Sequence, residues 1–392
     1  MTIEDFKQEI DVMFPCRWKN DFIQNVRETF DKYINIVSCV DGILGDTLVD
    51  VNSLCNKLTE VLKLYYDGRK GEAFIEFRAI MNGNTESEGL FSSIGCIDVN
   101  PEEFYYRARE RKIGVDFSIQ DMFHIPLNKR GVVSTQRYSS PGYPCLYLGN
   151  SAYSCWEEMR RIPFDNLMFS AYKVKYPFKV FDMRVPSASD YISEVLAHTI
   201  KRIPLMLACS FIVKNSSDVF KPEYIIPQLL VETIITNNRK ITQYEKSRID
   251  PDVIWGVIYT STHISSDFPY GKQFLQNIVL PVIESNNPST YCYCLASLFD
   301  ISRPLCYEYE SLKENTTRMH WEEVGLEKTE EEILREQYEQ SKMGYIEEKL
   351  KSAKFETLDY LVVDCPSEGI TLDCMGNPID FKVRSSGLFT IE

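Results

Sequence analysis

Apolar side chains recur at steps of three and four residues through the first part of the chain, which is the period of an amphipathic helix. Thr2 and Asp5 match a capping box at the start of the first run. A later run ends at Gly68, a residue type that suits the end of a helix. The pattern predicts a helical accessory domain over residues 1–95. Its apolar positions are Phe6, Ile10, Met13, Trp18, Phe22, Val26, Phe30, Tyr33 and Val37, then Leu54, Leu58, Val61, Leu62 and Tyr65.

The pattern changes near residue 104, where short apolar runs typical of strands begin to alternate with helical runs. Loop signals at 82–85 and 92–95 separate this region from the helices before it. The mixture predicts an α+β fold, although the sequence does not determine how the strands pair. The expected strands are 104–107, 145–148, 169–174 and 257–260, and the expected helices are at about 154–160, 189–197 and 227–236.

The last part of the chain predicts an acidic helix and a small sheet. Thr329 to Glu332 opens a charged helix, for which a solvated face is the simplest interpretation. Apolar residues alternate over 358–391 around the turn Gly376-Asn377-Pro378. We therefore expect a helical domain (1–95), an α+β domain (96–305) and a C-terminal extension (306–392).

Length and composition indicate a folded protein. The chain has 392 residues, of which 44% are apolar, and this suffices for two or three compact units and excludes a largely disordered chain. The first residues lack the basic start and apolar run of a signal peptide, and no segment approaches ~18 consecutive apolar residues. The 12 cysteines are scattered singly, which is typical of reduced thiols. We expect a cytoplasmic protein that does not enter a membrane.

The charge distribution is uneven. A net charge of −14 argues against direct binding to nucleic acid, because a polyanion requires a basic surface. One stretch is an exception, since its basic residues outnumber Glu110, Asp116 and Asp121. Those basic residues are Arg107, Arg109, Arg111, Lys112, Lys129, Arg130 and Arg137.

Several common catalytic and binding motifs are absent. The sequence contains no Gly-x-Gly-x-x-Gly after a strand, no Walker pattern and no Gly-x-Ser-x-Gly. Cys292 and Cys294 have no second Cys pair and no His at ligand spacing, so we expect no metal site. The histidines lie far apart, and each is more often structural than a catalytic base, with His124 and His263 the strongest exceptions. The other two are His198 and His320.

Three successive segments carry the most specific pattern: Phe123–Arg130, Gln136–Gly149 and Cys155–Met159. They contain an Arg-Tyr-Ser, a Pro-Gly turn, a Leu-Tyr-Leu strand and then a Glu on the following helix. In this order and spacing the residues resemble the RES domain, a family named for its Arg, Glu and Ser. The resemblance runs from about Tyr106 to Ser261.

Members of that family resemble ADP-ribosyltransferases in fold and act on NAD, commonly as toxins restrained by a partner antitoxin. The resemblance implies an ADP-ribosyltransferase-like mixed sheet and an enzyme that splits NAD and passes ADP-ribose to phosphate or water. NAD is then a substrate, phosphate a co-substrate, and no cofactor or metal is required. The catalytic residues implied are Glu158, Arg137, Tyr147 and Ser261, and the substrate-binding residues are Arg107, Lys129 and Arg130.

These residue types suit that chemistry. Cleavage between nicotinamide and ribose passes through an oxocarbenium-like centre, which a carboxylate such as Glu158 stabilises. A guanidinium holds phosphate oxygens through two parallel hydrogen bonds, a role for Arg137 and Arg107. Tyr147 offers a ring to stack on nicotinamide. Ser261 could bind the ribose or hold the carboxylate.

Some assignments stay open at this point. On a helix, Glu157 and Glu158 point about 100° apart, so only one can face a pocket. The number of residues between the Tyr and the Glu in the RES pattern, counted from Tyr147, selects Glu158. The remaining rivals are Arg109 for Arg107, and Ser265 or Ser266 for Ser261.

Two further functions are open as well. One is transfer of ADP-ribose to a protein or nucleic-acid target that the extra domains select. The other is a sensor or scaffold that binds a nucleotide without turnover. The long flanks distinguish this chain from the short toxins of the family, and the helical domain could restrain the site, recognise a trigger or mediate self-association.

Overall fold

The structure is a computed structural model that describes residues 1–43, 45–84, 87–91, 95–111, 117–242, 253–263, 274–282, 291–307, 310, 329–358, 381–383 and 389–391. The predicted N-terminal helices are confirmed. They are α1 (Ile3–Asp11), α2 (Phe22–Ser38), α3 (Gly45–Tyr66) and α4 (Lys70–Asn82), followed by the short strands β1 (Gly83–Asn84) and β2 (Ser87–Glu88). Thr2 and Asp5 form the predicted capping box. Gly68 has a φ of +81°, which glycine adopts without strain.

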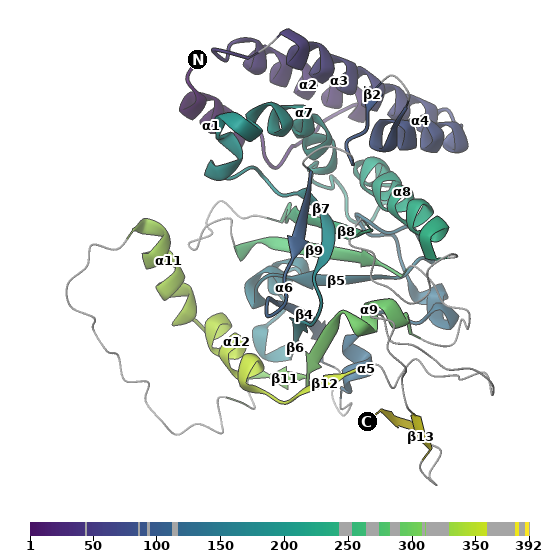
Figure 1. Ribbon diagram of the computed structural model, residues 1–392, viewed down its shortest axis with the longest axis vertical. Coiled ribbons are helices and arrows are strands. Elements are labelled where there is room, and N and C mark those ends of the chain that lie inside the picture. Colours follow the sequence, from purple (N-terminus) through teal and green to yellow (C-terminus); the bar gives the residue numbers. More distant parts are fainter. Residues whose placement is uncertain are drawn as a thin grey trace.

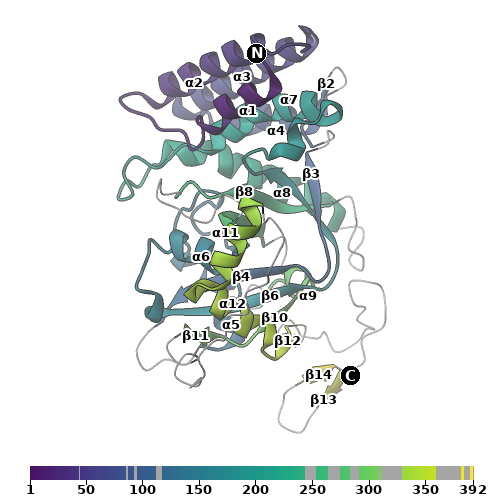
Figure 2. The same ribbon diagram turned by 90° about the vertical axis from the view of Figure 1, so that its left-hand side faces the viewer.

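Two later helices lie between this N-terminal layer and the sheet (Figures 1 and 2). They are α7 (Ser193–Cys209) and α8 (Ile225–Thr242). Helices α2 and α3 pack on α7, α4 packs on α8, and α8 packs on the sheet. One hydrophobic core therefore extends from Phe30 and Val61 in the N-terminal helices to Val257 and Val279 in the strands.

Ten described strands form one mixed sheet, which confirms the α+β class. Their order is β12-β10-β6-β4-β5-β9-β8-β7-β3, with β11 paired to another part of β6. Strands β7 and β8 run parallel, and the other pairs are antiparallel. The strands are β3 (Cys96–Val99), β4 (Phe104–Glu110), β5 (Cys145–Gly149), β6 (Leu167–Val174), β7 (Phe178–Met183), β8 (Ile254–Thr260), β9 (Gln276–Pro281), β10 (Phe299–Ser302), β11 (Leu305–Cys306) and β12 (Phe355–Thr357).

The sheet opens between β4 and β5. Strand β4 pairs with β6 along its whole length, but it pairs with β5 only at Tyr106 and Gly149. The two strands separate beyond that pair, so Arg107 on β4 and Leu148 on β5 are not joined by the ladder. Helix α6 (Ala152–Glu158) follows β5 and packs against both strands. The cavity at this divergence is lined by residues of both strands, among them Arg107 of β4 and Tyr147 of β5, and is called the wedge cavity below.

The C-terminal helices cover α6 and β6. They are α11 (Glu330–Glu339), which begins where the charged helix was predicted and has a capping box formed by Thr329 and Glu332, and α12 (Lys342–Ser352). Ile346 and Leu350 of α12 join the core formed by Phe169 and Cys155. In Figures 1 and 2, both helices lie beside the sheet, on the side of α6.

The remaining described elements are short. A small sheet at the end of the chain is confirmed, since β13 (Phe381–Val383) pairs antiparallel with β14 (Phe389–Ile391), although the predicted turn at 376–378 lies outside the described residues. No described helix is both long enough and apolar enough to cross a membrane. The short helices are α5 (Ile119–Met122), η1 (Leu127–Val132), η2 (Phe164–Asn166), η3 (Ala188–Tyr191), η4 (Pro222–Tyr224) and α9 (Tyr293–Ser297).

Candidate functional site

A cavity of about 520 Å³ lies where β4 and β5 diverge. Four of the predicted site residues line it: Arg107 from β4, Arg137 from the loop before β5, Tyr147 from β5 and Glu158 from the end of α6. These residues are far apart in sequence, and the opening of the sheet brings them to one space. The other lining residues that carry polar or ionisable groups include Gln136, Arg160, Ser216, Lys221, Tyr224, Tyr259, Thr262, His263 and Asn277.

The Glu158 carboxylate is held on one side and open on the other. Its Oε1 accepts hydrogen bonds from Ser261 Oγ and from Asn277 Nδ2, both at 2.7 Å. Its Oε2 lies 3.9 Å from Nε2 of His263. The side chain is 35% exposed, so a ligand can reach the carboxylate while two neutral donors fix its orientation.

Ser261 and Asn277 act on the site through Glu158. Ser261 is buried and does not line the cavity, and its backbone N–H donates to the carbonyl of Leu275 at 2.7 Å. Asn277 lies on β9, where Ser154 Oγ donates to its Oδ1 at 2.5 Å. Asn277 was not predicted, although an amide within an apolar strand is a signal of a buried polar role.

Glu157 points away from the cavity. It is buried, accepts a hydrogen bond from the hydroxyl of Tyr153, and forms an ion pair with Arg161 at 2.8 Å. Beyond the C-cap Met159 of helix α6, two residues have left-handed backbones, Arg160 (φ +57°) and Arg161 (φ +55°). Such a conformation is uncommon for residues other than glycine, and it is found most often where a helix ends. It directs the chain so that Arg160 lines the cavity.

Arg137 is buried and anchored to the backbone at the C-terminal end of α7. Its Nη1 donates to the carbonyls of Cys209 and Phe211, both at 2.9 Å, and its Nη2 donates to Thr262 Oγ1 at 2.7 Å. The guanidinium also lies over the ring of Tyr224, 5.5 Å from its centroid. These bonds use three of the five N–H donors of a guanidinium, so the remaining donors are available to a ligand.

Arg107 has a buried Nη1 atom without a hydrogen-bond partner. Burial lowers the pKa of this guanidinium from its usual value. An unpaired buried charge is costly, so an anion in the cavity would be strongly favoured. Nearby, Tyr147 donates from its hydroxyl to Ser139 Oγ at 3.1 Å. Burial raises the pKa of Tyr147 well above 10, so the phenol stays protonated.

Other predicted residues lie elsewhere. Lys129 and Arg130 are exposed on η1 and do not line the cavity. Arg109 donates to the backbone carbonyl of Asp121 and is not a lining residue either. His124 is buried away from the cavity lining, whereas His263 belongs to it. The rival positions Ser265 and Ser266 lie outside the described residues.

The charge of the cavity is opposite to that of the whole chain. Among the described residues, its lining carries four basic side chains and one carboxylate, that of Glu158, in a protein of net charge −14. Low-dielectric walls of one charge sign focus the field on a ligand of the opposite sign. The arrangement therefore suits an anionic ligand with an electron-poor centre placed at Glu158. The four basic residues are Arg107, Arg137, Arg160 and Lys221.

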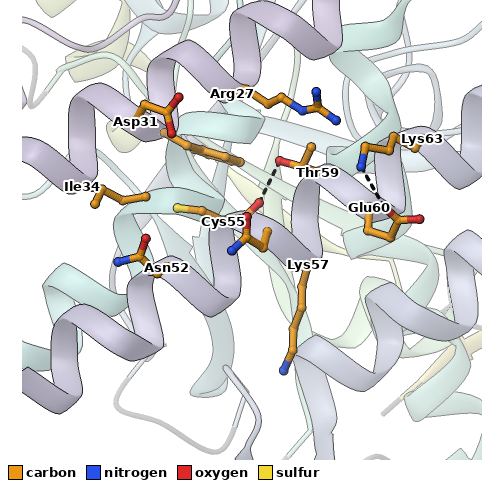
Figure 3. Close-up of a pocket in the computed structure, with 11 residues that line it drawn as sticks. Arg27, Asp31, Ile34, Asn52, Cys55, Lys57, Thr59, Glu60 and Lys63 are labelled. Atoms are coloured by element: carbon orange, nitrogen blue, oxygen red, sulfur yellow. Dashed lines mark hydrogen bonds and ion pairs between the residues drawn. The ribbon is translucent and has the colours of Figure 1, made fainter.

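A second hollow of about 540 Å³ lies on the helical layer, between α2 and α3 (Figure 3). Charged groups of both signs surround it, and two of them, Glu60 and Lys63, form an ion pair at 3.0 Å. Thr59 Oγ1 donates to the carbonyl of Cys55 within α3. No predicted site residue lines this hollow, so the wedge cavity is the candidate site.

The fold and the cavity together define an α+β protein with a basic ligand pocket built around one carboxylate. No family model and no solved structure matches the chain. A curated relative is the "Putative toxin YopC" of Bacillus subtilis (strain 168), with 30% identity over 313 residues that cover 75% of this chain and 67% of the relative. The chain belongs to the family of that protein.

Proposed function

We propose that this protein is an NAD-consuming enzyme of the RES type that cleaves the bond between nicotinamide and ribose and passes ADP-ribose to phosphate or water. The observation that carries the proposal is the wedge cavity, where Arg107, Arg137, Tyr147 and Glu158 all line one space. A role as a toxin is part of the proposal and rests on the name of the relative, "Putative toxin YopC". A location in the cytoplasm stays a prediction.

The pyrophosphate of NAD binds to the basic side of the cavity in this proposal. The guanidinium groups of Arg107 and Arg137, which both line the cavity, supply charged hydrogen bonds to phosphate oxygens. Charged hydrogen bonds are about twice as strong as neutral ones and are short, which fixes the register of the dinucleotide. Lys129 and Arg130 have no part in this site because they lie outside the cavity lining.

The reacting bond lies beside Glu158. As the bond from the ribose carbon to the nicotinamide nitrogen breaks, its electron pair leaves with nicotinamide and positive charge develops on the ribose. The Glu158 carboxylate, oriented by Ser261 and Asn277, stabilises that charge. An oxygen of phosphate or water then bonds to the ribose carbon, and water loses a proton in doing so.

The test is to incubate the purified protein with NAD, with and without inorganic phosphate, and to follow the products by phosphorus and proton NMR. A Glu158→Gln variant is assayed in parallel. Nicotinamide release that requires phosphate and is lost in the variant is the result expected of a phosphorolytic enzyme. Release without phosphate indicates transfer to water.

Two outcomes contradict the proposal. Turnover that appears only after addition of cell lysate, with ADP-ribose attached to a macromolecule, indicates a transferase. Intact NAD under every condition, together with unchanged cellular NAD on expression of the intact chain, indicates a nucleotide-binding sensor or scaffold. A partner antitoxin stays a prediction, and its test is co-purification with the protein from its own host.

A further inference from the structure

We propose that Trp18, between α1 and α2, is a positioning residue for the cavity, and that through it the N-terminal helices determine the affinity for the anionic substrate. The inference rests on the proposed function for its substrate, NAD, and it gives the helical region a role in binding. Trp18 itself does not line the cavity.

Trp18 is hydrogen-bonded to a buried carboxylate. Its Nε1 donates to Oε1 of Glu223 at 2.8 Å, and the backbone N–H of Lys214 donates to the same oxygen, also at 2.8 Å. Glu223 is 2% exposed, and its Oε2 is buried without a partner. A buried charge with few donors depends strongly on each of them. Loss of the indole N–H would therefore displace this carboxylate or draw water to it.

Glu223 lies in the turn η4, within two residues of two cavity residues. Lys221 precedes it and Tyr224 follows it, and both line the cavity. The ring of Tyr224 lies within reach of two cations, with Arg137 Cζ at 5.5 Å and Lys221 Nζ at 6.0 Å from its centroid. A shift of Glu223 therefore moves the aromatic surface against which both cations are placed.

A second chain of contacts joins the same segment to Arg137. The Trp18 ring packs edge-on against Phe22 at 5.3 Å, and Phe22 packs against Phe211 at 5.2 Å. The carbonyl of Phe211 accepts a hydrogen bond from Arg137 at 2.9 Å. In addition, the N–H of Ile212 donates to the carbonyl of Cys16 at 2.9 Å. The segment from Cys16 to Phe22 thus supports the backbone that orients the anion-binding guanidinium.

The test compares two substitutions that each remove one hydrogen bond, made in the whole chain. Trp18→Phe keeps an aromatic ring beside Phe22 but removes the N–H that binds Glu223, and it shortens the ring over which Lys214 Nζ lies, 4.7 Å from the centroid. Tyr33→Phe is the matched control, because Tyr33 of α2 donates from its hydroxyl to the carbonyl of Ile200 at 2.7 Å and contacts no cavity residue through that bond. Both changes remove one donor between the N-terminal helices and the rest of the protein.

Two readouts are measured for each variant. Hydrogen exchange is expected to accelerate at residues 212–224 in Trp18→Phe, with Lys214 as the most direct reporter, and to stay unchanged there in Tyr33→Phe. The KM for NAD is expected to rise about tenfold in Trp18→Phe with kcat within about twofold, since a bond to a buried charge is lost. A purely structural role would lower the amount of folded enzyme and leave KM unchanged.

The outcome is decisive even if NAD is not the substrate. If the wild-type protein leaves NAD intact, the proposed function fails, and the affinity for inorganic pyrophosphate, measured by calorimetry, replaces KM. About tenfold weaker pyrophosphate binding in Trp18→Phe, but not in Tyr33→Phe, supports the positioning role. Unchanged exchange at 212–224, equal effects of the two variants, or no pyrophosphate binding by the wild-type protein would overturn it.

Discussion

His124 is predicted to make the stability of the protein decrease as the pH falls below 7. The buried imidazole is hydrogen-bonded through Nδ1 to the carbonyl of Ile125 at 2.9 Å and accepts at Nε2 from the backbone N–H of Cys292, also at 2.9 Å. A neutral ring with its proton on Nδ1 satisfies both contacts. A second proton on Nε2 would face the N–H of Cys292, so protonation breaks that hydrogen bond.

The size of the effect follows from the pKa. Burial, with a smaller contribution from the charge of Arg107, lowers the pKa of His124 from 6.5 to about 4. The unfolded chain binds a proton at a higher pH than the folded protein does, so stability is complete above about pH 6.5 and is lost as the pH falls towards 4. With about 1.36 kcal/mol for each pKa unit, the total loss is about 3 kcal/mol, of which about 2 kcal/mol is lost by pH 5.

The assay is urea unfolding, followed by circular dichroism at pH 7.5 and pH 5. Wild type is compared with His124→Gln, whose amide can still donate and accept but does not titrate, and with His198→Gln as the control. The loss of stability between the two pH values is expected to be about 2 kcal/mol smaller in His124→Gln than in the other two proteins. Equal losses in all three proteins would refute the argument.

Two further predictions concern the supports of α6. Ser261→Ala removes one of the two donors to Glu158 Oε1. In the folded variant, kcat for NAD, measured as the initial rate of nicotinamide release, is expected to fall about tenfold. An unchanged kcat would show that the carboxylate does not need this hydrogen bond. Glu347→Ala removes the α12 carboxylate that accepts a hydrogen bond from the backbone N–H of Ala152 at 2.6 Å. The free energy of unfolding, measured in urea, is expected to fall by about 2 kcal/mol. Glu348→Ala, at an exposed neighbouring position, is expected to change the free energy of unfolding by less than about 0.5 kcal/mol, and equal effects of the two variants would contradict a supporting role for Glu347.

The helices and strands were predictable where the side-chain period is clear. The N-terminal helices alternate apolar and polar faces, because one side packs on α7 and α8 while the other meets water. Helix α7 was expected near 189–197 but spans Ser193–Cys209. Its second half, from Ile203 onward, is buried between the N-terminal helices and the sheet and is apolar on all sides. This half also contains Pro204. Such a segment has no amphipathic period.

Arg137, Tyr147 and Glu158 were predictable because they lie close together in sequence, whereas Arg107 and Ser261 were identified only from the resemblance to the RES domain. Tyr147 and Glu158 are separated by one turn and one short helix, so their spacing carries the pattern. Asn277 and His263 reach the cavity through the pairing of β5, β9 and β8, and pairing between distant strands cannot be read from local periodicity. Lys129 and Arg130 belong to the same basic stretch as Arg137, but charge alone does not indicate that η1 faces solvent.

The most direct test of the proposed enzyme is the initial rate of nicotinamide release from NAD by two neighbouring variants. Glu158→Gln removes the charge of the carboxylate in the cavity, and Glu157→Gln removes the charge of its neighbour, which is buried against Arg161. We predict that Glu158→Gln lowers kcat by at least about a hundredfold, whereas folded Glu157→Gln retains most of the activity. Equal losses in both variants, or full activity in Glu158→Gln, would contradict the assignment of the wedge cavity as the site of NAD cleavage.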